Sequence, residues 1–284
     1  MTTVLDVQRF KDEGRRFAML TAYDYLSARI LDEAGIPILL VGDSLGMVML
    51  GYPTTLPVTL DDMIHHAKAV ARGSRQALLV GDMPFMSYHQ SVEQAIASAG
   101  RFLQEAGMHA VKLEGGGHVV EITRRLTRLG IPVMGHLGLT PQFVHQMGGF
   151  KVQGKTETQG ARILADAKEL EQAGAFSLVL EGVPSALAGR ITKALRIPTI
   201  GIGAGPQTDG QVLVFHDVMG LTTGKAPKFV KRYANLADEI ARAAHQFSED
   251  VRTGAFPAPE HSYSANGSAP DAQPVPEEVK YGAG

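Results

Sequence analysis

The 284-residue sequence contains no cysteine. It can therefore form no disulfide, thiolate nucleophile or cysteine-ligated metal centre, and any bound metal must use carboxylate, histidine or water ligands. No uncharged apolar run reaches the roughly 18 residues that a membrane-spanning helix needs. The polar start MTTVLDVQRFKDEGRR lacks the apolar segment of an export signal. These absences fit a cytoplasmic protein with no membrane partner.

The sequence also lacks a large excess of charge of either sign. The formal net charge is -2, with 20% charged and 44% hydrophobic residues. That composition is typical of a folded globular protein, and it offers no basic surface for a phosphate backbone. Nucleic acid is therefore not an expected partner. Length alone does not distinguish one large α/β domain from two small ones.

Short runs rich in Val, Ile and Leu recur from Arg16 onward, and each is followed by a turn and a stretch with helical apolar spacing. The predicted strands are 17–23, 37–42, 77–82, 110–115, 132–137, 176–182, 198–203 and 211–217. The predicted helices include LDDMIHHAKAVARG, VEQAIASAGRFLQEAG, VVEITRRLTRLG, GARILADAKELEQAG and SALAGRITKALR, several of which end on glycine.

Strands buried on both faces that alternate with helices indicate a parallel sheet, and eight such units are the number that closes a (β/α)8 barrel. An open doubly wound sheet is the alternative. The glycine-rich turn at 201–205 comes late in the chain and lacks an acidic residue at the usual spacing, which disfavours a dinucleotide site. We predict a catalytic barrel over residues 1–247. Residues 248–284, rich in Pro, Gly, Ser and Ala, are predicted to form a flexible tail.

Polar side chains stand where the predicted strands end, which is where barrel enzymes place their active sites. The ends of strands two to six carry Asp43, Ser44, Asp82, Lys112, Glu114, His136 and Glu181. Crowded carboxylates without a counter-charge are costly, so a bound cation is expected. Oxygen ligands from Asp43, Asp82 and Glu114 favour Mg²⁺ with positions left open for a small oxo acid.

Each residue also has a plainer interpretation. The aspartates could cap the following helices, and Lys112 could form only a structural salt bridge. His136 could be packed inside the barrel top. Glu181 follows the apolar run SLVL, a setting that suits a general base, although it could simply pair with a cation.

The strings LTAYDYLSARILDEAGIPILLVGDSLGMVMLGYPTTLPVTLDDMIHHAKAVARG, LLVGDMPFMSY, AVKLEGG, VMGHLGLTPQ and LVLEGVP resemble those of the ketopantoate hydroxymethyltransferase family, also called 3-methyl-2-oxobutanoate hydroxymethyltransferases. The resemblance runs from about Val4 to about Phe247. It implies a TIM barrel of the phosphoenolpyruvate/pyruvate type and a cytoplasmic homo-decamer. It also implies transfer of a hydroxymethyl group from 5,10-methylenetetrahydrofolate, the co-substrate, to 3-methyl-2-oxobutanoate. The product is 2-dehydropantoate, in the first step of pantoate and pantothenate synthesis.

The resemblance also assigns roles to the candidate residues. It implies one Mg²⁺ per subunit at Asp43, Asp82 and Glu114, and oxo-acid contacts from Asp43, Ser44, Asp82, Lys112 and His136. Glu181 becomes the proton acceptor in a reaction through a metal-stabilised enolate. The alternatives are another metal-dependent barrel lyase or mutase acting on a small 2-oxo acid, which often needs a cysteine, and a non-catalytic metabolite-binding barrel.

Overall fold

A computed structural model describes residues 1–224 and 226–263, and the chain divides into two compact units, Met1–Arg232 and Tyr233–Gly284. The second unit contains helix α10 (Leu236–Thr253) and the short 3-10 helix η2 (Pro259–His261). The boundary that we placed after Phe247 falls inside α10. The tail was predicted to be flexible over residues 248–284, but residues 248–253 belong to α10. Residues 264–284 lie outside the described residues, and for them the flexibility stays a prediction.

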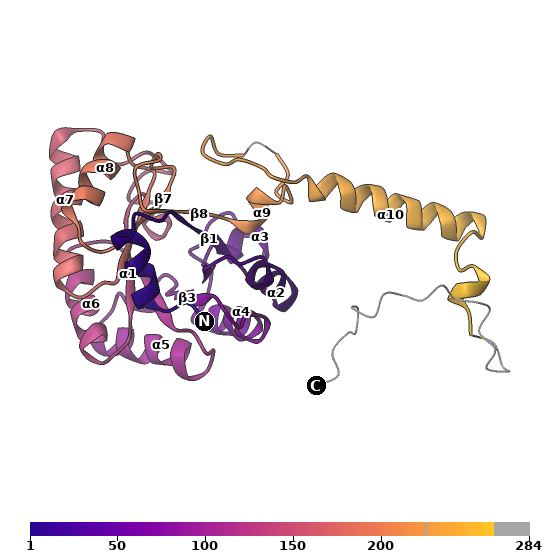
Figure 1. The fold of residues 1–284 in the computed structure, drawn as a ribbon, viewed down its shortest axis with the longest axis horizontal. Helices are drawn as coiled ribbons and strands as arrows, with labels where there is room; N and C mark the ends of the chain where they lie inside the picture. The colour runs from indigo at the N-terminus through magenta and orange to yellow at the C-terminus, as the bar shows by residue number, and fades with distance from the viewer. Residues whose placement is uncertain (225, 264–284) are drawn as a thin grey trace. The chain divides into compact units, whose positions relative to one another are not determined.

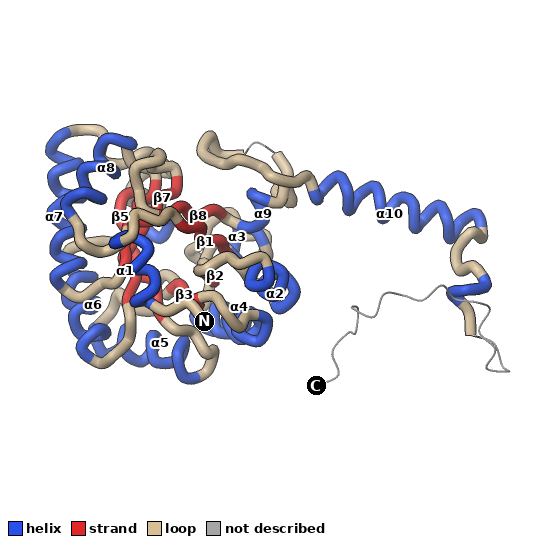
Figure 2. The backbone as a smooth tube through the Cα atoms, in the orientation of Figure 1, coloured by secondary structure: helices blue, strands red, loops and turns tan. Residues whose placement is uncertain are grey.

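The first unit is a closed barrel of eight parallel strands in sequential order, with β8 paired to β1. The predicted (β/α)8 fold is therefore confirmed, and the open-sheet alternative is wrong. Figure 2 shows the strands in red inside a ring of blue helices. The strands are β1 (Phe17–Thr21), β2 (Ile38–Val41), β3 (Leu78–Asp82), β4 (Ala110–Glu114), β5 (Val133–Gly138), β6 (Ser177–Glu181), β7 (Thr199–Ile202) and β8 (Gly210–Leu213).

Six longer helices connect successive strands and lie around the outside of the barrel (Figure 1). Three helices of the unit begin with a threonine capping box, at Thr3, Thr59 and Thr156, which satisfies backbone N–H groups that a helix start leaves free. The connecting helices are α2 (Tyr25–Glu33), α4 (Leu60–Gly73), α5 (Val92–Gln104), α6 (His118–Arg128), α7 (Glu157–Gln172) and α8 (Ser185–Ala194). The shorter elements are α3 (Leu45–Val48), α9 (Phe215–Val218) and the 3-10 helix η1 (Pro141–Phe143).

The last predicted strand was too long. We expected a strand over 211–217, but β8 ends at Leu213 and α9 begins at Phe215. The backbone N–H of Phe215 donates to Oγ1 of Thr21 at 2.8 Å, which ties the start of α9 to the end of β1. A short apolar run such as VLVF does not by itself distinguish a strand from a short helix.

Residues of the barrel strands alternate between two hydrophobic layers, because successive side chains of a strand point to opposite faces. The inner layer includes Ile38, Leu40, Leu78, Val80 and Ala110, whereas their neighbours Leu39, Leu79 and Val111 pack outward against the helices. Helix α1 (Val4–Asp12) adds two apolar side chains, Val7 and Phe10, to the inner layer. Apolar side chains thus fill the barrel interior along most of each strand. The polar side chains lie at the C-terminal ends of the strands.

Candidate active site

The same alternation directs the side chains of the predicted strand-end residues toward the barrel interior. In β3, Asp82 follows the inward-facing Leu78 and Val80 at spacing two, and in β4 Lys112 and Glu114 follow Ala110. His136 and Glu181 follow the inward-facing Met134 and Val179 in the same way. The strand register places Asp82 opposite Lys112 and Glu114 opposite His136. A strand-end carboxylate on each of several strands therefore faces the same interior.

One cavity of about 430 Å³ collects these side chains. Its lining includes all of the site residues predicted from the sequence, namely Asp43, Ser44, Asp82, Lys112, Glu114, His136 and Glu181. Asp43 lies just after β2, and the hydroxyl of Ser44 is 2.8 Å from that of Tyr23. The structure therefore brings together every side chain that the sequence singled out.

Asp43, Asp82 and Glu114 form the one acidic cluster with metal-ligand geometry among the described residues. One carboxylate oxygen of each lies within 4.8 Å of those of the other two, and all three residues are buried. Neither aspartate caps a helix. Ser44 is the cap residue of α3, and Oδ2 of Asp82 accepts from the backbone N–H of Asp43 at 3.3 Å.

The cluster crowds carboxylates together at a buried position. Three buried carboxylates face one buried lysine, Lys112, whose Nζ lies 2.8 Å from Oδ1 of Asp82 and 3.6 Å from Oε1 of Glu114. Burial, together with the neighbouring carboxylates Asp82 and Glu114, raises the pKa of Asp43 well above its ordinary value. Carboxylate oxygens gathered in this way are the donor set of a hard divalent cation. The cluster is therefore compatible with a divalent metal.

A chain of close contacts leads from the acidic cluster to Glu181. Nδ1 of His136 lies 3.2 Å from Nζ of Lys112 and 3.3 Å from Oε1 of Glu114, while its Nε2 lies 3.3 Å from Oε2 of Glu181. Burial and Lys112 lower the pKa of His136, but Glu114 and Glu181 outweigh them and raise it to about 9. The imidazole therefore lies between the carboxylates of Glu114 and Glu181, which favour its protonated form.

Two buried residues support the acidic cluster and were not predicted. The backbone N–H and the side-chain Nε2 of Gln142 donate to Glu114 and Asp43, respectively, each at 3.0 Å. The hydroxyl of Tyr88 donates to Oε1 of Gln142 at 2.8 Å. Both residues stand in motifs that we quoted, GDMPFMSY and GHLGLTPQ, but no local pattern showed that they turn toward the strand ends.

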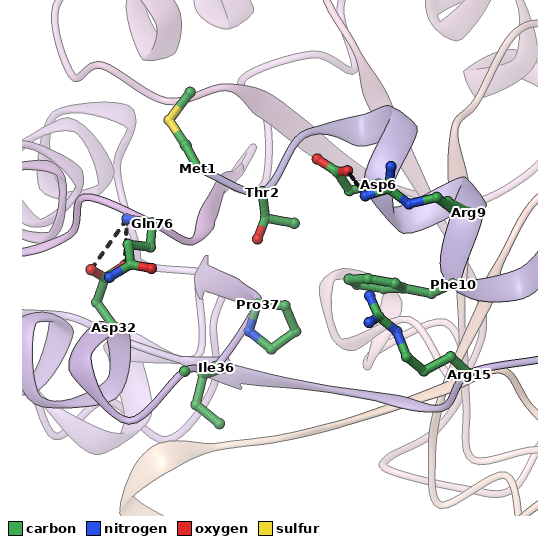
Figure 3. A pocket seen from close by; sticks show the side chains of 11 residues that line it. Met1, Thr2, Asp6, Arg9, Phe10, Arg15, Asp32, Ile36, Pro37 and Gln76 are labelled. Atoms are coloured by element: carbon green, nitrogen blue, oxygen red, sulfur yellow. Dashed lines mark hydrogen bonds and ion pairs between the residues drawn. The ribbon is translucent and has the colours of Figure 1, made fainter. Parts of the chain in front are cut away.

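A second hollow lies at the opposite, N-terminal ends of the strands (Figure 3). Arg15, Pro37 and Gln76, which line it, precede β1, β2 and β3 respectively. Its two acidic groups are engaged, since Asp6 pairs with Arg9 and the Asp32 carboxylate accepts three backbone N–H bonds. None of the predicted site residues lines it, which leaves the larger cavity as the candidate active site.

Comparison with known sequences agrees with the motifs. The family model described as ketopantoate hydroxymethyltransferase matches residues 1–259. The 3-methyl-2-oxobutanoate hydroxymethyltransferase of Syntrophus aciditrophicus (strain SB) is 60% identical over 257 residues, covering 90% of this chain and 94% of the relative. The enzyme of the same name from Chloroflexus aurantiacus (strain ATCC 29366 / DSM 635 / J-10-fl) is 58% identical over 260 residues, covering 92% of each.

Solved structures with a similar fold are far more distant in sequence. A phosphonopyruvate hydrolase in complex with oxalate and Mg²⁺ superposes with a TM-score of 0.59 at 14% identity, covering 92% of this chain and 93% of the other. A 2,3-dimethylmalate lyase of the PEP mutase/isocitrate lyase superfamily gives 0.57 at 16% identity, covering 94% and 93%. These likenesses concern the barrel fold alone. Within residues 1–224 and 226–263, the structure has no helix with the length and apolar character needed to cross a bilayer.

Proposed function

The chain belongs to the ketopantoate hydroxymethyltransferase family and is a transferase, and from this premise we propose the details of its reaction. The proposed reaction moves a hydroxymethyl group from 5,10-methylenetetrahydrofolate to 3-methyl-2-oxobutanoate, giving 2-dehydropantoate. The observation that carries the proposal is the acidic cluster of Asp43, Asp82 and Glu114 in one cavity with Lys112 and Glu181.

Asp43, Asp82 and Glu114 would hold Mg²⁺. When bound there, the ion would act as a Lewis acid on the oxo acid and make the hydrogen on its C3 more acidic. The oxo acid is anionic. The buried ammonium of Lys112 lies beside the acidic cluster, where it can pair with the carboxylate of the bound oxo acid. The hydroxyl of Ser44 supplies a further hydrogen-bond partner at the same end of the cavity.

Glu181 is the proposed base. Its side chain is 15% exposed, lines the cavity, and lies at the end of β6 with an oxygen toward His136. The carboxylate takes the C3 proton, and the electron pair left behind is delocalised onto the 2-oxo oxygen as an enolate. Lys112 and His136 supply positively charged donors for that developing negative charge.

Formation of the carbon–carbon bond at C3 follows the proton transfer. The electron pair on C3 attacks the methylene carbon carried by the folate, and the first of the two bonds from that carbon to folate nitrogens breaks. Water then replaces the second folate nitrogen on that carbon, so the hydroxyl group of the product comes from water. The remaining hydrogen of the water and the proton held by Glu181 complete the two N–H groups of tetrahydrofolate, and Glu181 is again ionised for the next turnover.

The alternative remains another metal-dependent barrel lyase or mutase acting on a small 2-oxo acid. Such an enzyme would cleave or rearrange its substrate without a folate, whereas the proposed reaction requires one in both directions. Release of formaldehyde equivalents from 2-dehydropantoate only when tetrahydrofolate is present supports the transferase. Release without tetrahydrofolate supports the alternative.

The central experiment follows the C3 hydrogen of 3-methyl-2-oxobutanoate by NMR in deuterated buffer. We expect its signal to disappear when the protein and Mg²⁺ are both present, and to persist when the metal is chelated. A C3 signal that persists with protein and Mg²⁺ would contradict the proposal, because metal, base and substrate are tested together. We also propose, by likeness to the family, that the protein is a cytoplasmic homo-decamer. Light scattering of the full chain would test the oligomeric state.

A further inference from the structure

The candidate active-site cavity has two chemically different regions. At its inner end the three acidic residues and Lys112 are buried, between 1% and 4% exposed. Its rim is apolar instead, and Met47, Phe150 and Phe229 are 40%, 52% and 41% exposed there. Exposed apolar side chains around a hollow are characteristic of ligand-binding grooves. A small oxo acid accounts for the inner end alone, so the rim is suited to a second, largely apolar ligand.

One further carboxylate lines this cavity. Asp217 of α9 lines the cavity, and among the described residues it is the only lining carboxylate apart from the acidic cluster and Glu181. The hydroxyl of Thr222 donates to its Oδ1 at 2.7 Å, which orients the group. An ionised carboxylate has two oxygens and about four acceptor positions, so a side chain held in this way can accept from two adjacent N–H groups of a ligand.

Phe229 is positioned close to the proposed base. A side-chain carbon added at Gly203 would lie 2.9 Å from a ring carbon of Phe229, so the ring lies directly against the backbone that follows β7. In the strand register Glu181 pairs with Ile202, the residue before Gly203. The ring of Phe229 thus lies against the residue that follows the strand partner of Glu181, and both residues line the cavity.

We propose that this outer region, with Asp217 as the acceptor and Phe150 and Phe229 as apolar walls, is the binding site for the pterin ring of the folate. A pterin is a flat heteroaromatic bicycle, and aromatic side chains pack well against such faces. Its 2-amino-4-oxo pyrimidine edge presents adjacent N–H donors, which match the two oxygens of a carboxylate. The inference rests on the proposed function, because it assumes a folate as the carbon donor.

The test separates the two half-reactions. Exchange of the C3 hydrogen requires the oxo acid, Mg²⁺ and the base but no folate, whereas product formation requires all of them. We expect Asp217→Asn to raise the KM for 5,10-methylenetetrahydrofolate about tenfold to a hundredfold, the range for losing a hydrogen bond to a charged group. The rate of C3 exchange should stay within about twofold of the unmodified protein. Asp61→Asn is the matched control, since Asp61 is a surface residue with its side chain 83% exposed, and it should change neither quantity.

A second variant and a binding measurement distinguish loss of the pterin site from misfolding of Asp217→Asn. Phe229→Ala should weaken calorimetric binding of tetrahydrofolate while leaving C3 exchange intact. An unchanged folate KM in Asp217→Asn, or a loss of exchange that parallels the loss of transfer, overturns the pterin site. Absence of both exchange and transfer in the unmodified protein overturns the proposed function itself. These outcomes are distinguishable because the folate-free exchange is measured in every variant.

Discussion

Gln142 holds Asp43 by a hydrogen bond of 3.0 Å from its Nε2 to Oδ2 of the aspartate. The same amide group also donates to the backbone oxygen of Met83 at 2.9 Å, and its oxygen accepts from the hydroxyl of Tyr88. Because every polar atom of the Gln142 side chain is engaged, the amide has one orientation. Together with the backbone bond to Glu114, it fixes two of the three acidic residues relative to each other.

We predict that Gln142→Leu weakens divalent-metal binding. Partners of metal ligands typically contribute about tenfold to a hundredfold to metal affinity, and leucine supplies neither the donor to Asp43 nor the acceptor for Tyr88. Calorimetric titration with Mn²⁺, without substrate, measures the effect independently of turnover.

Gln8→Leu serves as the control for that titration. Gln8 donates from the outer face of helix α1 to Asp12 and to the backbone of Arg196, and it does not line the cavity. Its variant should bind Mn²⁺ with normal affinity. Equal Mn²⁺ affinity for Gln142→Leu and the unmodified chain would mean that Gln142 does not position the acidic residues.

Much of this arrangement could be predicted from the sequence because it follows local periodicity. Eight βα units fix the barrel, and spacing two along a strand carries Lys112 and Glu114 to the same face. Strand ends on a closed barrel meet at one rim, so Asp43, Asp82 and Glu114 could be grouped before any distance was known.

The unpredicted residues depend on contacts between distant segments. Gln142 reaches Asp43 across 99 positions, because η1 turns back over the strand ends, and no spacing pattern encodes that turn. Asp217 was assigned to a strand because VLVF continues the apolar run of β8. The turn into α9 is fixed partly by the bond between Phe215 and Thr21, which are 194 positions apart. Such long-range contacts have no signature in a single sequence.

A pair of glycines tests the packing of helix α5 on the barrel. A side-chain carbon at Gly81 would lie 2.4 Å from the ring of Phe102, which is fully buried, whereas nothing lies within 4 Å of one at Gly100. We expect Gly81→Ala to lower the free energy of unfolding by about 1–3 kcal/mol through overpacking. Gly100→Ala, in the interior of α5, should raise it by about 0.5–1 kcal/mol. Urea denaturation of both variants measures these changes, and equal stabilities would contradict the packing.

Asp32 should stabilise the fold in a pH-dependent way. Burial alone would raise its pKa, but bonds from the Ser74 hydroxyl and three backbone N–H groups lower it below the ordinary 3.8. A lowered carboxyl pKa stabilises the folded state above the unfolded pKa, and this contribution disappears as the pH falls through the folded pKa. Asp32→Asn should therefore cost about 1–3 kcal/mol at pH 7.

The pH series supplies the check on Asp32. The stability difference between Asp32→Asn and the unmodified protein should be constant above about pH 5 and shrink below about pH 4. Asp61→Asn, at an exposed carboxylate, should show little difference at any pH. A difference for Asp32→Asn that grew on acidification would have the wrong sign for this explanation.

Replacing the proposed base separates chemistry from binding. Glutamine has nearly the shape of glutamate and can still contact His136, but it cannot accept a proton from carbon. Since a positioned base supplies about 10²–10⁴-fold, Glu181→Gln should lose turnover by that factor. Affinity for Mg²⁺ and for 3-methyl-2-oxobutanoate should change only a few-fold, because the acidic cluster and Lys112 are untouched.

The measurement for Glu181→Gln is C3 deuterium exchange by NMR, alongside calorimetric titration of Mg²⁺ and the oxo acid. Glu157→Gln is the matched control, because Glu157 pairs with Arg190 on the surface with its side chain 81% exposed. Its exchange rate should be normal. Exchange at the normal rate in Glu181→Gln would remove that residue from the role of base. In that case His136 becomes the next residue to test, because its Nε2 lies 3.3 Å from Oε2 of Glu181. Among the described residues, no other histidine lines the cavity.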